Sequence, residues 1–170
     1  MFGTKCKYNK KPREAQQGFT IIEILVVITV FVTAFVAILG FFVLDIGLSD
    51  KNKMRLKALS LSEEGIEAVR FVRDNNLWAS TLATFNLNAD YHPIISGFSW
   101  NIVSGGENIN GFTRTIIFNA VSRDANDNIE NIYHLSNDDP NTRKITVIVS
   151  WLGRGGADSE SLSTYLTNWK

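Results

Sequence analysis

An uncharged stretch of 21 residues near the N-terminus is the feature that most constrains how this chain can fold. It runs from Ile24 to Leu44 and reads ILVVITVFVTAFVAILGFFVL. A helix of this length is roughly 30 Å long, which matches the hydrocarbon core of a bilayer. A buried core helix is the alternative, but a chain of 170 residues has little with which to cover a helix that is apolar on every side. The stretch therefore predicts a transmembrane helix.

A short basic segment precedes the apolar stretch. Residues 1–18 hold five of the 17 basic residues and one of the 17 acidic residues of the chain. Basic residues before a transmembrane helix tend to stay in the cytoplasm, so we expect the N-terminus inside and the rest of the chain exported. Removal of residues 1–18 would leave 12 basic and 16 acidic residues, a formal net charge of −4, and would also remove Cys6, the single cysteine. The remaining chain would need no oxidant to fold outside the cytoplasm.

The junction between the two segments carries the most specific motif of the chain. It reads GFTIIE over residues 18–23. This motif resembles the processing site of type IV pilins and pseudopilins, with Ile21 in place of the family's usual Leu, and the resemblance covers about residues 5–45. It implies cleavage between Gly18 and Phe19 by a prepilin peptidase on the cytoplasmic side, followed by N-methylation of the new Phe19 amine. The apolar stretch is kept after such a cut.

Glu23 is an acidic residue at the edge of an apolar helix, where a charge is costly unless it has a partner. After cleavage, the Phe19 amine would lie four residues earlier on the same helix face. The amine of a neighbouring subunit could pair with Glu23 equally well. The resemblance implies that this acid neutralises the terminal amine of the adjacent subunit and sets the axial register of a filament. An acid that merely sits at headgroup level is the alternative.

An ordinary signal peptide is the main competing interpretation. Val32-Thr33-Ala34 offers small residues suited to signal peptidase, and cleavage there would release a secreted protein that starts at Phe35. However, the apolar stretch is longer than the usual 7–15 residues of a signal peptide, and it continues for ten residues beyond Ala34. The N-terminal residue of the mature protein separates the two hypotheses.

The helical pattern continues past the apolar stretch. In residues 50–75, apolar side chains recur at steps of three and four, which predicts an amphipathic helix with one buried face. The residues predicted on that face are Met54, Ala58, Leu59, Leu61, Gly65, Ile66, Ala68, Val69 and Val72. A helix from Phe19 to about Asn75 would be roughly 85 Å long. Because Gly weakens a helix, we expect bending or melting at Gly40 and Gly47.

After Asn75 the pattern changes to short β-branched and aromatic segments separated by Gly and Pro. We predict strands at 97–103, 112–123, 131–135, 143–152 and 161–169. Residues 76–96 read as irregular, with a second short helix within 78–86. No helix-length segment separates the later strands, so the sheet should be antiparallel.

These patterns divide the chain into four parts: a basic leader (1–18), a transmembrane and assembly helix (19–45), its amphipathic continuation (46–75) and a β-rich head (76–170). The predicted fold class is α+β. A long N-terminal helix packed on a C-terminal antiparallel sheet is the architecture that the pilin resemblance implies.

The head contains one candidate cation site with a D-x-N-x-N-x-E pattern, formed by Asp124, Asn126, Asn128 and Glu130. Oxygen ligands at this spacing can wrap Ca²⁺, and some pseudopilins bind calcium in a loop. The pattern departs from an EF-hand, because Ile129 replaces the loop glycine and Leu135 replaces the closing Glu. A polar hairpin turn with Asx hydrogen bonds explains the same residues. We expect no cofactor and keep calcium as the weaker alternative.

Enzyme activity is not expected, because no nucleophile motif, phosphate-binding loop or pair of catalytic carboxylates is found. His92 and His134 have no ligand or nucleophile close to them in sequence, and the four Trp residues suit a core or subunit contacts. Four arginines of the head could contact DNA in a competence pilus: Arg114, Arg123, Arg143 and Arg154. With an acidic excess after processing, we do not expect a nucleic-acid partner.

The resemblance implies a structural subunit of a type IV pilus, a competence pilus or a type II secretion pseudopilus. The segments GIEAVRFVRD and ITVIVSW look more like those of a minor pilin or minor pseudopilin. Expected partners are other subunits, the prepilin peptidase, the assembly platform and the cytoplasmic membrane, which the chain would cross once before it moves to a pilus or a periplasmic pseudopilus. The alternative from another class is a single-span anchor that presents a binding domain outside the cytoplasm and does not polymerise.

Overall fold

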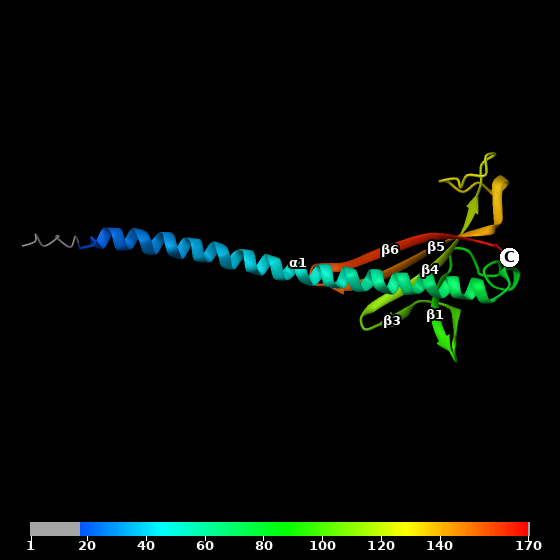
Figure 1. Ribbon diagram of the computed structural model, residues 1–170, viewed down its shortest axis with the longest axis horizontal. Coiled ribbons are helices and arrows are strands. Elements are labelled where there is room, and N and C mark those ends of the chain that lie inside the picture. The colour runs from blue at the N-terminus through cyan, green and yellow to red at the C-terminus, as the bar shows by residue number, and fades with distance from the viewer. Residues whose placement is uncertain (1–17, 170) are drawn as a thin grey trace, which may run out of the picture. The chain divides into compact units, whose positions relative to one another are not determined.

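A computed structural model describes residues 18–169 of the protein. They form one long helix and a six-stranded antiparallel sheet, as Figure 1 shows. The chain divides into two compact units, one that ends at Ile46 and one that begins at Gly47. The α+β fold class, with a helix packed on an antiparallel sheet, is confirmed.

Helix α1 runs from Ile21 to Asn75, a length of 55 residues. It begins two residues after the predicted start at Phe19 and ends where the sequence predicts. Gly40 and Gly47 both lie within the continuous helix. The melting that we expected at these glycines is therefore absent.

The sheet has the strand order β2-β1-β4-β5-β6, and the short strand β3 pairs with β4. The strands are β1 (Asp90–Ser96), β2 (Ser99–Ser104), β3 (Glu107–Ile109), β4 (Phe112–Ser122), β5 (Asp138–Gly153) and β6 (Gly156–Thr167). Every neighbouring pair is antiparallel, as predicted. Four of the predicted strands correspond to β2, β4, β5 and β6, with ends that differ by a few residues.

The strand predicted at 131–135 was wrong. This segment belongs to a loop that leads into a short 3₁₀ helix, η2 (Leu135–Asn137). Single hydrogen bonds, and not a strand ladder, hold this part of the chain to the end of β4: the Glu130 N–H donates to the Ser122 carbonyl, and the His134 N–H donates to the Ser122 hydroxyl. The apolar residues of the segment stay exposed as a result.

Strand β1 was missed because Pro93 lacks an N–H group and looks like a strand breaker. Only Asp90 and Tyr91 of β1 pair with β4, so the rest of the strand is hydrogen-bonded to β2 alone. The Gly105 N–H donates a hydrogen bond to the Asp90 carbonyl on the β2 side. Because the backbone groups of successive residues alternate between the two sides of a strand, the Pro93 nitrogen points to the opposite side, where this part of β1 pairs with no strand. The helix expected within 78–86 is a single 3₁₀ turn, η1 (Trp78–Ser80).

The core of the second unit lies between the C-terminal part of α1 and one face of the sheet. The helix contributes Ala58, Leu61, Ser62, Gly65, Ile66, Ala68, Val69 and Val72. Strands β4 and β5 face them with fully buried Ile116, Phe118, Ile145, Val147 and Val149. The predicted buried face is confirmed apart from Met54, which is 42% exposed, and Leu59, which is half-buried.

Gly65 allows α1 to approach β5 closely. A Cβ atom at this position would lie 3.1 Å from Cγ1 of Val147 and 3.6 Å from Cδ of Arg114. Arg114 is 2% exposed, and its Nη1 donates to the Leu61 carbonyl of α1 at 3.0 Å. Its Nε donates to Glu107 at 2.6 Å. A buried guanidinium that is paired in this way joins β4, β3 and α1.

We expect Gly65→Leu to lower the free energy of unfolding of the second unit by about 1–3 kcal/mol, because a larger side chain would collide with Val147. The measurement is urea unfolding of the full chain in detergent, followed by the fluorescence of the buried Trp78 and Trp151. Ser60→Leu is the matched control, since Ser60 lies on the exposed face of the same helix. Equal stability of the two variants would contradict this account of Gly65.

Candidate functional site

The GFTIIE motif lies at the accessible start of α1. Gly18, Phe19 and Thr20 precede the first helical residue, Ile21. Phe19 is 79% exposed, and a Cβ atom added to Gly18 would meet no other atom within 4 Å. The peptide bond between Gly18 and Phe19 is therefore open to a protease within the described part of the chain. Residues 1–17 of the predicted leader lie outside the described residues.

Glu23 lies in the first turn of α1. Its backbone N–H donates to the Thr20 carbonyl at 3.1 Å, and that of Ile24 donates to the same carbonyl at 3.3 Å. A carboxylate in this turn interacts favourably with the partial positive charge of the helix N-terminus. The Glu23 side chain is exposed, and no ion pair joins it to a basic group among residues 18–169. It is thus available to a charged group of another molecule.

The apolar stretch of α1 is exposed on all of its faces. None of the residues from Ile21 to Leu44 is buried in the structure. The two polar side chains inside the stretch are satisfied by the helix itself, because Thr29 and Thr33 donate to the carbonyls of Val26 (2.8 Å) and Val30 (2.9 Å). Within residues 18–169, α1 is the one helix long and apolar enough to cross a membrane. A helix of this kind needs lipid or other apolar helices around it.

The chain matches no protein-family model, no curated protein and no solved structure. The likeness to pilins therefore depends on the GFTIIE motif and on the arrangement of one long apolar helix and an antiparallel sheet.

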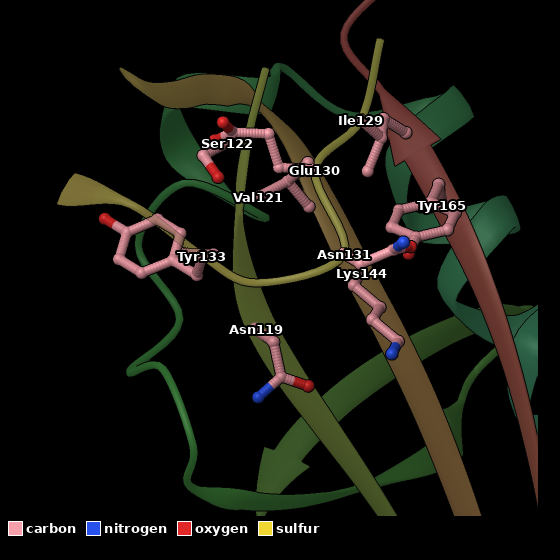
Figure 2. A pocket seen from close by; sticks show the side chains of 10 residues that line it. Asn119, Val121, Ser122, Ile129, Glu130, Asn131, Tyr133, Lys144 and Tyr165 are labelled. Carbon is pink, nitrogen blue, oxygen red and sulfur yellow. The ribbon is translucent and has the colours of Figure 1, made fainter. Parts of the chain in front are cut away.

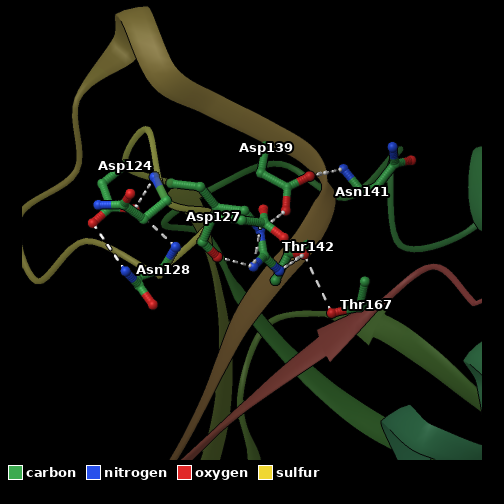
Figure 3. A network of polar contacts seen from close by, with 9 residues as sticks. Asp124, Asp127, Asn128, Asp139, Asn141, Thr142 and Thr167 are labelled. Carbon is green, nitrogen blue, oxygen red and sulfur yellow. Dashed lines mark hydrogen bonds and ion pairs between the residues drawn. The ribbon is translucent and has the colours of Figure 1, made fainter.

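The candidate calcium loop is a hairpin turn held by Asx hydrogen bonds, which Figure 3 shows. One carboxylate oxygen of Asp124 accepts from the backbone N–H groups of Asn126 (2.8 Å) and Asn128 (2.9 Å). The other accepts from the Asn128 side-chain amide at 3.2 Å. Asp127 adopts a positive φ of 65° at the apex. Glu130 makes a long contact of 3.4 Å from its Oε1 to the Asn137 amide.

These contacts favour the hairpin interpretation over a calcium site. Both oxygens of Asp124 already accept hydrogen bonds from amide N–H groups. Among residues 18–169 no group of three or more His, Cys, Asp or Glu side chains could hold a metal, but this finding does not cover a loop in which two of the four candidate ligands are Asn. Asp124, Asn126, Asn128 and Glu130 lie in one loop, as the sequence predicts, and the hydrogen bonds of Asp124 stabilise the turn of that loop.

A second polar cluster connects this hairpin to the start of β5 (Figure 3). The Arg123 Nε donates to Asp139 at 2.7 Å, its Nη1 donates to the Asp127 carbonyl at 2.8 Å, and its Nη2 lies 3.3 Å from the Thr142 hydroxyl. Asp139 also accepts from the backbone N–H of Asn141 at 3.0 Å. The Arg123 guanidinium thereby fixes the loop against the sheet.

The pKa values of the Asp124 and Asp139 carboxyl groups are lowered from their usual range. Hydrogen bonds from Asn128, and then from Asn126, hold the pKa of Asp124 down. Burial alone would raise the pKa of Asp139, but hydrogen bonds from Arg123, Thr142 and Asn141 outweigh it and lower that pKa. In both cases the ionised form is the one that stabilises the loop.

A pocket lies between this loop and the sheet, as Figure 2 shows. Polar and aromatic side chains from the loop and from three strands line it: Asn119, Ser122, Glu130, Asn131, Tyr133, Lys144 and Tyr165. The Ser122 hydroxyl accepts a hydrogen bond from the backbone N–H of His134 at 3.0 Å. Ser122 is therefore engaged by the backbone and is not paired with a base in the described part of the pocket.

Two of the four arginines considered for DNA contact are buried. Arg114 is 2% and Arg143 is 8% exposed. Arg123 is committed to Asp139 and the hairpin. Arg154 is the one exposed member of this set. The head therefore does not present these arginines as one basic surface.

The structure also shows contacts between α1 and β6 that sequence reasoning missed. Arg55 donates to Glu160 of β6 at 3.0 Å, and Lys51 lies 3.7 Å from Asp158 of the same strand. These pairs attach the first turns of the second unit's helix to β6. The spacing of four residues between the two bases is visible in the sequence, but their partners lie more than 100 residues away and no local pattern identifies them.

We expect the loop from Arg123 to Asp139 to lose its ordered hydrogen bonds in acid. Because the pKa values of Asp124 and Asp139 are lower in the folded state, their stabilising effect is present above the unfolded pKa, about 3.9, and is lost as pH falls through the folded pKa. Hydrogen exchange of the Asn126 and Asn128 amides, corrected for the intrinsic pH dependence, should accelerate below about pH 4. Asp124→Asn should flatten this dependence, and unchanged protection in the wild-type chain at about pH 3 would refute the assignment.

Proposed function

We propose that this chain is a structural subunit of a type IV pilus or a related pseudopilus, with the character of a minor pilin or minor pseudopilin. The observation that carries the proposal is the part of α1 from Ile24 to Leu44, which is apolar and uncovered on every face and directly follows GFTIIE. Prepilin peptidase would cleave between Gly18 and Phe19, and the Phe19 amine would be methylated. The chain is then a substrate of processing and a building unit, and not a catalyst.

The physical basis of assembly is an exchange between two apolar surroundings. In the membrane the stretch from Ile21 to Leu44 contacts lipid, and in a filament it would contact the same stretch of other subunits. Because lipid tails and Leu or Val side chains are similarly apolar, this transfer costs little. The exposed carboxylate of Glu23 would then pair with the Phe19 amine of a neighbouring subunit. An ion pair among apolar helices fixes one axial register, since any other leaves a charge without a partner.

The mature N-terminus is the first test. We expect mass spectrometry of the protein from its native membrane to show a chain that begins with N-methylated Phe19. Gly18→Val should block this cut, because a β-branched side chain would stand where the peptidase needs close access to the backbone. Ser60→Val is a control on the exposed face of α1. A native product that keeps residues 1–18, or that starts at Phe35, would refute the proposal.

The role of Glu23 is the second test. We expect Glu23→Ala to reduce incorporation into filaments at least tenfold while the protein remains in the membrane, since the Phe19 amine of the next subunit loses its partner. Sheared filaments and membranes are compared by quantitative immunoblot. Glu63→Ala is the matched control, because Glu63 is an exposed acid on the same helix and has no ion pair among the described residues.

The same experiment separates a filament subunit from a single-span anchor. Both would remain in the membrane and both would expose the head. An anchor that does not polymerise has no use for Glu23, so Glu23→Ala would leave its distribution unchanged. Equal filament recovery for the wild-type chain and the variant would therefore favour the anchor.

A further inference from the structure

The hairpin of β1 and β2 ends in an exposed apolar tip. Ser96 pairs with Ser99, so the loop consists of Gly97 and Phe98 alone. Gly97 has a φ of +65°, which is the requirement of a two-residue hairpin turn with Gly in first position. Phe98 is 105% exposed and Ile95 is 67% exposed. The turn is short and regular, so Phe98 cannot fold back onto the core.

This tip extends beyond the part of β1 that is held in the sheet. Only Asp90 and Tyr91 pair with β4, and Figure 1 shows the hairpin leaving the line of the other strands. From residue 91 to residue 106 the sequence contains no Asp, Glu, Lys or Arg. The hairpin thus presents an uncharged projection, which we call the knob, with Ile95 and Phe98 at its end.

A groove in the same unit has matching chemistry. It lies between the first turns of the second unit's helix and the turn from β5 to β6, and it has a volume of about 380 Å³. Gly47, Met54, Trp151, Leu152 and Gly155 contribute its apolar lining. A cavity of about 150 Å³ already accommodates a benzene molecule. The groove is therefore large enough for the Phe98 ring and the side chain next to it.

Four charged side chains also line the groove, two of each sign: Asp50, Lys51, Arg154 and Asp158. Lys51 pairs with Asp158 at 3.7 Å across the rim. Gly47 has no side chain, and a Cβ atom added there would meet nothing within 4 Å. Because these charges sum to zero, the rim neither attracts nor repels a guest by net charge, which suits an uncharged tip that occupies the apolar part of the groove.

We propose that the knob of one subunit docks in the groove of a second copy of this chain. The knob arises at the β2 edge of the sheet and the groove lies at the turn between β5 and β6, so the two belong to different elements of the same unit. A contact of this kind is head-to-tail, since each copy offers a knob to one neighbour and a groove to another. Such contacts generate rings or open helical arrays rather than closed dimers.

This inference rests on the proposed function, because a contact of this size needs subunits that a filament already holds together. One aromatic side chain buries about 150–250 Å², while a stable interface between free proteins needs about 1,200 Å² or more. Two free heads would therefore not stay together through this contact alone. Subunits held side by side by their apolar helices are at high effective concentration, and a small contact is then sufficient.

Cysteine cross-linking in cells that make the filament tests the contact. The full chain carries Cys6→Ser, with Ser99→Cys beside the knob and Gly155→Cys at the groove, where a Cβ atom has space. Phe98 itself is kept. A short bismaleimide should give a ladder of dimers, trimers and longer products, and each single-cysteine chain should give no ladder.

Substitution of the knob supplies the matched comparison. Phe98→Asp in the double-cysteine chain should reduce the ladder about tenfold or more, because the contact loses the aromatic ring and a carboxylate would have to leave water to enter. Leu135→Asp is the control, since Leu135 is also strongly exposed, at 80%, but lies in η2. A ladder that survives Phe98→Asp, products that stop at dimers, or cross-links to a different protein would each overturn the proposal.

A reporter in the apolar helix separates failure of this contact from failure of the proposed function. Val27→Cys in the Cys6→Ser chain should form cross-linked dimers wherever helices pack side by side. If these dimers form and the head ladder does not, the knob-in-groove contact is refuted and the filament remains. If neither forms, the proposed function fails and the contact fails with it.

Discussion

The close contact between Gly65 and Val147 is the constraint on which the second unit depends. Without a side chain at residue 65, the helix comes near enough to β5 for the Arg114 guanidinium to reach the Leu61 carbonyl. That guanidinium is buried, and Glu107 pairs with it. One residue of β4 therefore holds a helix turn, the short strand β3 and the sheet together. A buried cation in such a network is worth little as a pair, but removing any member leaves a costly uncompensated charge.

Helix α1 has two parts that differ in what covers them. From Ala58 to Val72 its apolar side chains are covered by the sheet of its own chain, whereas from Ile21 to Leu44 none of its residues is covered by anything in the structure. The apolar surface of that first part is far larger than an isolated soluble chain would expose. Lipid and other apolar helices are the two surroundings that suit it, and the proposed function would use both in turn.

Much of this architecture was predictable, because the spacing of apolar residues along a helix or strand indicates which of its faces is buried. The alternation of Val147, Val149 and Trp151 with Thr146, Ile148 and Ser150 matches the buried and partly exposed faces of β5. Strand β1 was not predictable from its residues, because Pro93 argues against a strand. Pro93 is tolerated there because no strand pairs with this part of β1 on one side. The exposure of Gly18, Phe19 and Glu23 agrees with the motif, but their processing and pairing depend on molecules outside the chain. Arg114 was considered as a surface residue, since no local pattern shows that a helix passes over it.

The sheet ends on a long edge strand, and the side chains of that strand affect whether another chain can pair with it. Strand β6 has 12 residues and pairs with β5 alone within the described chain. An open edge of this length invites addition of a foreign strand and amyloid-like aggregation. Asp158 and Glu160 of β6 form ion pairs with Lys51 and Arg55 of α1. Charged side chains held on an edge strand oppose such addition. These surface ion pairs contribute little stability, but they keep charge on the edge strand and so limit pairing with another chain.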